Sequence, residues 1–172
     1  WSLDHVGILV RTVTDAALML TVLSGEDPGD PGSLAMPAPD FSRQMLEFTS
    51  PPRIGLVREY FSETANSEMW SHTEGVAQRL AASGAEVVEL TLPPSFSSAH
   101  SVQRIVMNVE CAAFHEQFFK DRADEYGSKI RASIEMGLLV PAAKYLQAQR
   151  LRRQFRHEMI ETIRHVDIVM TP

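Results

Sequence analysis

WSLDHVGILVRTVTDAALMLTVLSG, residues Trp1–Gly25, is the stretch around which the chain is organised. Its apolar, β-branched run Val6–Val10 predicts a strand buried within a sheet. Thr12 and Asp15 then form a Thr-x-x-Asp pattern, which is typical of a helix start capped by the threonine hydroxyl. The apolar residues that follow recur at helical spacing, and Gly25 predicts the end of the helix. That helix face consists of Val13, Ala16, Leu20 and Leu23.

A proline-rich connection follows. Glu26–Pro52 holds six of the ten prolines, so it can sustain neither a long helix nor a central strand. One helical turn is expected around Phe41–Phe48. The stretch therefore predicts a long surface connection.

Arg53–Leu92 predicts a strand–helix–strand unit. The strands are expected at Ile54–Val57 and Glu86–Leu92, the second near a sheet edge because apolar and polar residues alternate along it. The helix between them is expected to start at Asn66 or Ser67 and to end at Gly84. A connection of this length favours a parallel crossover.

The last third of the chain predicts three helices and a strand. The first helix is expected from Ser98 to about Glu125, the second over Ser128–Met136, and the third from Pro141 to about Arg164. The run Asp167–Thr171 then predicts a strand of the kind buried on both faces. The fold class that these patterns indicate is α/β and helix-rich.

Composition narrows the class of protein. A net charge of −6 argues against a nucleic-acid binder, and no apolar run reaches the ~20 residues that span a bilayer. The one cysteine, Cys111, excludes an internal disulfide and favours a reducing compartment such as the cytoplasm. Because Trp1 and the final Thr171-Pro172 both adjoin apparent core elements, we expect the chain to be a piece of a larger protein.

The pattern Ser-Leu-Asp-x-x-Gly, followed by Arg-Thr-Val-x-Asp-Ala-Ala, resembles the segment just after the nucleophile loop of amidase signature enzymes. One departure is Ile8, where the family usually has proline. The stretches RIGLVREYF, YGSKIRASIEMG and DIVMTP resemble later elements of that family in the same order. The residues that carry the first match are Ser2, Leu3, Asp4, Gly7, Arg11, Thr12, Val13, Asp15, Ala16 and Ala17.

This resemblance implies a part of an α/β/α layered fold with a mixed sheet. It makes 1–172 a partial amidase domain, built from 1–25, 26–52, 53–92 and 98–172. The implied activity is hydrolysis of carboxylic amides by a serine nucleophile, helped by a second serine in a cis peptide and a lysine. In the family all three precede the matched segment, so no catalytic residue is expected in this chain. The resemblance implies no metal or organic cofactor, a small amide substrate, the remainder of the amidase chain as a partner, and a possible homo-oligomer.

Four residues are candidates for structural support of the active-site region: Ser2, Asp4, Gly7 and Arg11. Charged side chains beside a buried strand are costly without a partner. Asp4 and Arg11 therefore either pair with each other, with neighbours or with backbone groups, or Asp4 supports the nucleophile loop of the intact enzyme. The sequence favours the first interpretation.

Other nucleophile–base combinations are weak. Ser97-Ser98 lacks the glycines of a nucleophile loop and fits a helix-capping loop. Ser2, Asp4 and His5 are adjacent, and adjacent side chains on an extended chain point to opposite faces. The lysines that could act as bases all fit solvated helix faces: Lys120, Lys129 and Lys144.

Metal and RNA sites are also disfavoured. His157, Glu161 and His165 share one helix face at i, i+4 and i+8, but no further ligand is evident. Cys111 and His115-Glu116 fit packed positions on an apolar helix. A basic series that could suggest RNA occupies several faces rather than one stripe: Lys144, Arg150, Arg152, Arg153, Arg156 and Arg164.

One position discriminates between subclasses of the family. Relatives that form the glutamine-hydrolysing component of transfer-RNA amidotransferases tend to carry paired arginines where this chain has Ala132 and Ser133, with Arg131 one residue away. A guanidinium suits a carboxylate because it binds both oxygens. Its absence favours a stand-alone amidase for which glutamine is a poor substrate. The alternatives are a non-catalytic assembly or binding module and that glutamine-hydrolysing A subunit.

Overall fold

The computed structural model describes residues 2–30, 32–47 and 50–172. The chain forms two compact units, Trp1–Ser50 and Pro51–Pro172. Phe48, the last residue of the predicted helical turn, lies outside the described residues, as does Trp1.

The first unit contains two helices, α1 (Val13–Leu23) and α2 (Phe41–Glu47), which pack on each other. Thr12 caps α1 as predicted, because its hydroxyl oxygen accepts a hydrogen bond from the Asp15 N–H at 3.1 Å. Gly25 follows the last helical turn with φ +119°, a conformation that favours glycine. The Phe41 N–H donates to the Thr21 hydroxyl at 3.3 Å and links the two helices.

The predicted strand at Val6–Val10 is wrong for this structure. The segment is extended but belongs to no strand, and the side chains of Val6 and Leu9 are 85% and 100% exposed. A β-strand requires a neighbouring strand for its backbone hydrogen bonds, and the strands of the described sheet come from other segments. Apolar composition alone therefore does not place these residues in the sheet.

The apolar face of α1 is largely exposed. Val13, Leu20 and Leu23 are exposed, and Ala17 is the buried residue of this helix. The reason is that α1 packs against the short α2, which is too small to cover an apolar stripe three turns long.

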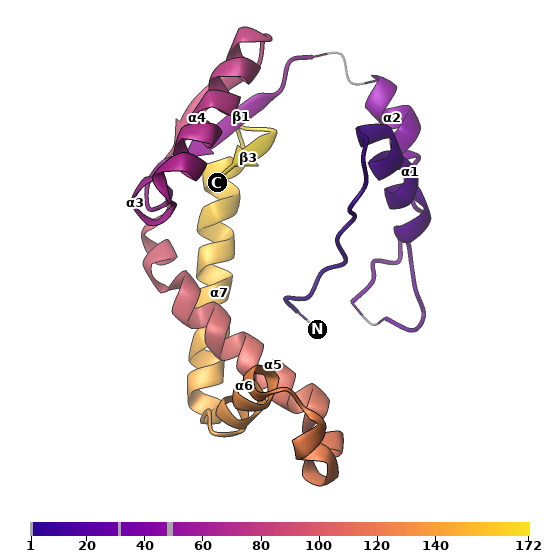
Figure 1. Ribbon diagram of the computed structural model, residues 1–172, viewed down its shortest axis with the longest axis vertical. Coiled ribbons are helices and arrows are strands. Elements are labelled where there is room, and N and C mark those ends of the chain that lie inside the picture. The colour runs from indigo at the N-terminus through magenta and orange to yellow at the C-terminus, as the bar shows by residue number, and fades with distance from the viewer. Residues whose placement is uncertain (1, 31, 48–49) are drawn as a thin grey trace. The chain divides into compact units, whose positions relative to one another are not determined.

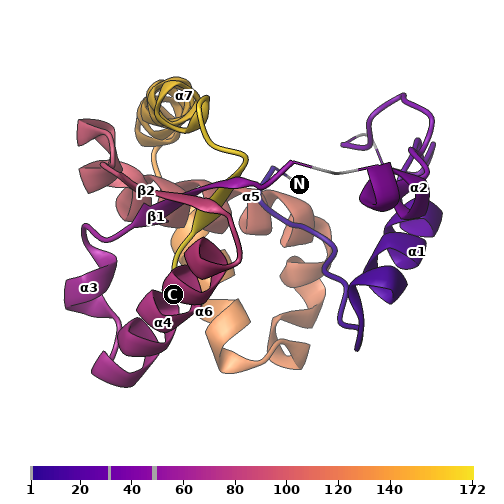
Figure 2. The ribbon, with the colours of Figure 1, turned by 90° about the horizontal axis from the view of Figure 1, so that it is seen from above.

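The second unit contains a parallel sheet of three strands, β1 (Arg53–Val57), β2 (Glu86–Leu90) and β3 (Ile168–Met170), in the order β2-β1-β3. The parallel pairing of β1 with β2 and the edge position of β2 confirm the prediction. Figure 2 shows the strands between α4 (Ser67–Ala82) on one side and α7 (Ala142–Ile163) on the other. No antiparallel strand of the expected mixed sheet occurs in the described ranges.

The strand β3 forms where it was expected but is not buried on both faces. Ile168 and Val169 are exposed, whereas β1 is buried from Ile54 to Val57. Only β1 pairs with β3 among the strands that the structure describes, so β3 is an edge strand and lacks cover.

In the second unit α4 lies beside the sheet, and α6 (Ser128–Leu138) lies toward the opposite end of α7 (Figure 1). Asn66 caps α4 through a 2.7 Å bond that its side-chain oxygen accepts from the Met69 N–H, as predicted. The predicted second helix extends past Met136, and Pro141 is the N-cap of α7 rather than its first residue. The remaining elements are α3 (Phe61–Thr64), η1 (Pro94–Ser98), α5 (Ala99–Arg122) and η2 (Ala123–Glu125).

The core of this unit includes residues of β1 and of the helices α5 and α6. Its most completely buried side chains are Val57 of β1, Val106 of α5 and Ile134 of α6. Gly137 permits close contact of α6 with α5, because a Cβ at this position would meet the Asn108 carbonyl oxygen and lie 2.7 Å from the Ala112 Cβ. The small residue at position 137 thus allows α6 to pack closely on α5.

Candidate functional site

The four predicted support residues lie on the extended segment before α1. Ser2, Asp4, Gly7 and Arg11 are all exposed, and a Cβ at Gly7 would meet nothing within 4 Å. The Asp4 carboxylate accepts a 3.1 Å hydrogen bond from the His5 backbone N–H. The four residues therefore lie on one extended segment, and all of them are exposed.

The adjacent Ser2, Asp4 and His5 do not form a nucleophile–base–acid relay. The Nδ1 atom of His5 lies 2.8 Å from the Leu3 carbonyl oxygen, and the Asp4 oxygen is engaged by backbone. A relay needs the carboxylate on the imidazole Nδ1–H, which here faces a carbonyl.

The serine pair Ser97-Ser98 belongs to the turn that leads into α5. The Ser97 hydroxyl donates to the Pro94 carbonyl at 2.9 Å, inside η1. Ser98 is the N-cap residue of α5, although its side chain makes no capping bond. Both observations place the pair in a helix-entry turn.

Metal ligation finds no support. No group of three or more His, Cys, Asp and Glu residues in 2–30, 32–47 and 50–172 could hold a metal ion. His165 lies beyond the end of α7, and the carboxylate of Glu161 pairs with Arg164 at 2.9 Å. The predicted shared helix face is therefore incomplete.

A cluster of charged residues at the carboxyl end of β1 is not predicted by the sequence analysis. The Arg58 guanidinium lies 2.6 Å from the Glu74 carboxylate and 3.5 Å from that of Glu89, and it stacks over Trp70 with 5.2 Å to the ring centroid. The hydrogen bond to Glu74 raises the pKa of Arg58. Residues between 12 and 31 positions apart meet here, and no sequence spacing signals such a contact. The guanidinium of Arg58 thus links α4 and β2 to the end of β1.

Two residues after Arg58, Tyr60 adopts φ +69°, which is rare for a residue with a side chain. Its ring contacts those of Phe61, Phe96 and His100 at centroid distances of 5.2 to 5.4 Å. Ring packing on several sides offsets the cost of this backbone conformation. The arrangement fixes the turn between β1 and α3.

A polar contact joins α5 to α7. The Tyr145 hydroxyl lies 3.4 Å from the Glu110 carboxylate and accepts a 2.7 Å hydrogen bond from the Gln149 side chain. All three residues are half-buried. This contact orients the two helices, and its members were not among the sequence candidates.

Near the end of α5, a cavity of about 340 Å³ is lined by aromatic and charged side chains. His115 Nδ1 lies 3.1 Å from the Tyr126 hydroxyl at its wall. The other lining residues are Phe114, Phe118, Arg122 and Glu125. Cavities of this volume can hold small ligands, but this one contains no serine and no lysine.

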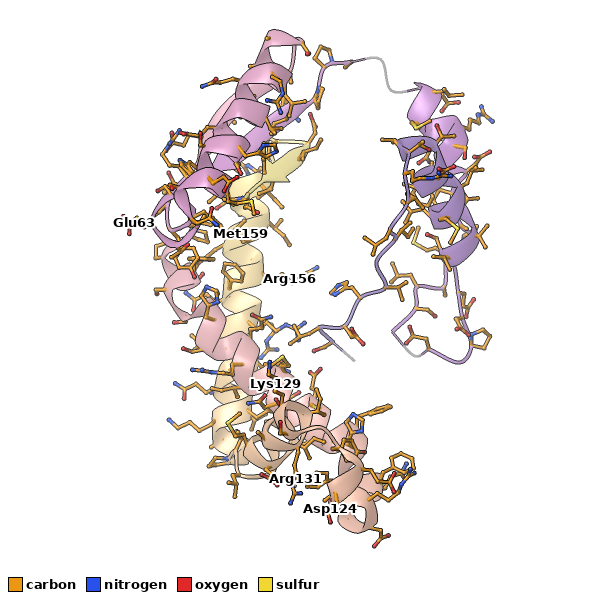
Figure 3. All side chains as sticks on the ribbon, viewed as in Figure 1. Glu63, Asp124, Lys129, Arg131, Arg156 and Met159 are labelled. Atoms are coloured by element: carbon orange, nitrogen blue, oxygen red, sulfur yellow. The ribbon has the colours of Figure 1, made fainter. Side chains whose placement is uncertain are left out.

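Arg131, the alternative cation for a glutamine carboxylate, is already paired. Its guanidinium lies 2.8 Å from Asp124 of η2 and 2.9 Å from Glu135 of α6 (Figure 3). The hydrogen bond to Glu135, then that to Asp124, raises the pKa of Arg131. Two carboxylates hold the side chain away from any role as an open anion site.

Comparison with known proteins gives a consistent result. The family model described as Amidase matches residues 1–172. An amidase of Pseudomonas putida is 34% identical over 172 residues, which is 100% of this chain and 37% of that protein. The A subunit of the glutamyl-tRNA(Gln) amidotransferase of Thermosynechococcus vestitus is 31% identical over 99% of this chain and 40% of its own length. The chain thus spans about two-fifths of the curated relatives it matches.

Solved structures of related proteins also match this chain. A protein complex described as vestigial, which reveals the evolutionary origins of an s-triazine catabolic enzyme, matches with a TM-score of 0.78 and 26% identity, over 94% of this chain and 34% of that chain. The 6-aminohexanoate cyclic dimer hydrolase matches with a TM-score of 0.71 at 18% identity, over 91% of this chain and 34% of its own. The second likeness is one of fold alone. No helix in the described part of the chain is long and apolar enough to cross a membrane.

Proposed function

The chain belongs to the Amidase family, and from this premise we propose that it is the middle-to-late portion of an enzyme that hydrolyses carboxylic amides to an acid and ammonia or an amine. The observation that carries the proposal is the family match, which runs through every residue of the chain. The catalytic serine lies outside these residues in our proposal.

The chemistry requires an activated hydroxyl beside a base, with backbone N–H donors at the oxyanion that develops on the carbonyl. Two candidates considered for such a combination are engaged elsewhere, which supports the proposal: the Ser97 hydroxyl donates to a carbonyl, and the His5 Nδ1 lies against the Leu3 carbonyl. The role we propose for this chain is therefore to shape and support the site.

We assign that support to Ser2, Asp4, Gly7 and Arg11. The segment is exposed in this structure, so its backbone and side chains are accessible to a neighbouring loop. In our proposal the Asp4 carboxylate accepts hydrogen bonds from the nucleophile loop. Loss of these contacts would displace the serine, and displacement of about 1 Å already costs rate steeply.

Small neutral amides are the proposed substrates. Ala132 and Ser133 carry no charge, and the neighbouring Arg131 is held by two carboxylates. A substrate carboxylate entering here would lose a charge-assisted hydrogen bond. A second candidate, the glutamine-hydrolysing A subunit of an amidotransferase, is favoured by the 31% identity to a protein of that kind.

The cellular setting is proposed from the same features. The single cysteine, Cys111, is free and fits a reducing compartment, for which we propose the cytoplasm. Assembly into a homo-oligomer is also proposed. The solved relative described as part of a vestigial protein complex supports association through protein surfaces for this fold.

The test is an assay of the longer gene product that contains this chain. Simple aliphatic and aromatic amides are offered, and release of ammonia is measured together with labelling by a serine-reactive fluorophosphonate. We expect turnover and labelling, with turnover lost in proportion to labelling. A product that shows neither would support the non-catalytic module instead.

A further inference from the structure

We draw no further inference here: the strongest candidate, the cavity of about 340 Å³ at the C-terminal end of α5 that the exposed rings of Phe114 and Phe118 help to line, carries none because nothing in the structure shows what covers that face of α5 in a chain that spans about two-fifths of its curated relatives.

Discussion

Arg53 and Asp167, 114 residues apart, join the N-terminal ends of two neighbouring strands. The Asp167 carboxylate accepts a 2.8 Å hydrogen bond from the Arg53 backbone N–H and lies 3.0 Å from its guanidinium. The Asp167 N–H in turn donates to the Arg53 carbonyl at 2.8 Å. The contact holds β3 in register with β1.

Asp167→Asn should therefore lower the free energy of unfolding and weaken its dependence on acid. The guanidinium hydrogen bond, followed by the backbone bond, lowers the pKa of Asp167. A carboxyl with a lowered pKa contributes stability above its unfolded-state pKa and loses it as the pH falls through the folded one. We expect the wild type to lose more stability than Asp167→Asn between about pH 5 and pH 2.

Urea unfolding at a series of pH values measures this difference. Glu116→Gln is the matched control, because Glu116 forms an exposed pair with Lys120 at 3.6 Å. Equal acid dependence of all three proteins would contradict the role given to Asp167.

Gly137→Ala should destabilise the second unit by roughly 1–3 kcal/mol, the usual cost of overpacking. The added methyl would meet the Asn108 backbone and the Ala112 side chain and push α6 from α5. Gly75→Ala should instead stabilise α4 by up to about 1 kcal/mol, because its Cβ meets only the flexible Arg79 side chain at 3.6 Å. Thermal unfolding should show a lower melting temperature for Gly137→Ala and a higher one for Gly75→Ala. The same change in both variants would contradict this account.

Asn66→Ala should cost about 0.5–2 kcal/mol, since it removes the acceptor that caps α4. Asn66→Asp keeps an oxygen at the same place and should restore most of the stability. Denaturant titration of the three proteins gives the comparison. If aspartate were as harmful as alanine, the Met69 N–H bond would not be the cause.

How far the sequence predicts this structure depends on whether a signal is local. Caps at Thr12 and Asn66 and the strands at Ile54–Val57 and Ile168–Met170 follow from neighbouring residues and are correct. Val6, Leu9 and Ile168 are exposed in this chain although their runs are apolar, because burial depends on partners distant in sequence. The short helix α3, and the turn at Tyr60 before it, have no strong local signal.

The candidate sites show the same division. That Ser97-Ser98 is a helix-entry turn could be predicted from the prolines that precede it. The contacts of Arg58 with Glu74 and Glu89 could not, because they arise only when β1, α4 and β2 are assembled. The same holds for the Tyr145–Glu110 contact across two helices.

Glutamine should be a poor substrate of the longer gene product compared with neutral aliphatic or aromatic amides. A carboxylate that enters a site without a free cation loses about 1.5–3 kcal/mol, equivalent to a loss of roughly 10- to 150-fold in kcat/KM. Ser133→Arg should narrow the gap if this position faces the substrate. Competition kinetics between glutamine and a neutral amide measures this preference. A clear preference of the unaltered enzyme for glutamine would favour the glutamine-hydrolysing A subunit over a stand-alone amidase.

The most direct test of the central claim is to locate the reactive serine. The longer gene product is labelled with a fluorophosphonate, digested, and mapped by mass spectrometry, with the 172-residue chain treated in parallel. We predict one labelled serine outside residues 1–172, loss of amide hydrolysis in proportion to labelling, and neither label nor turnover in the chain alone. A labelled serine within these residues, or amide turnover by the isolated chain, would contradict the account.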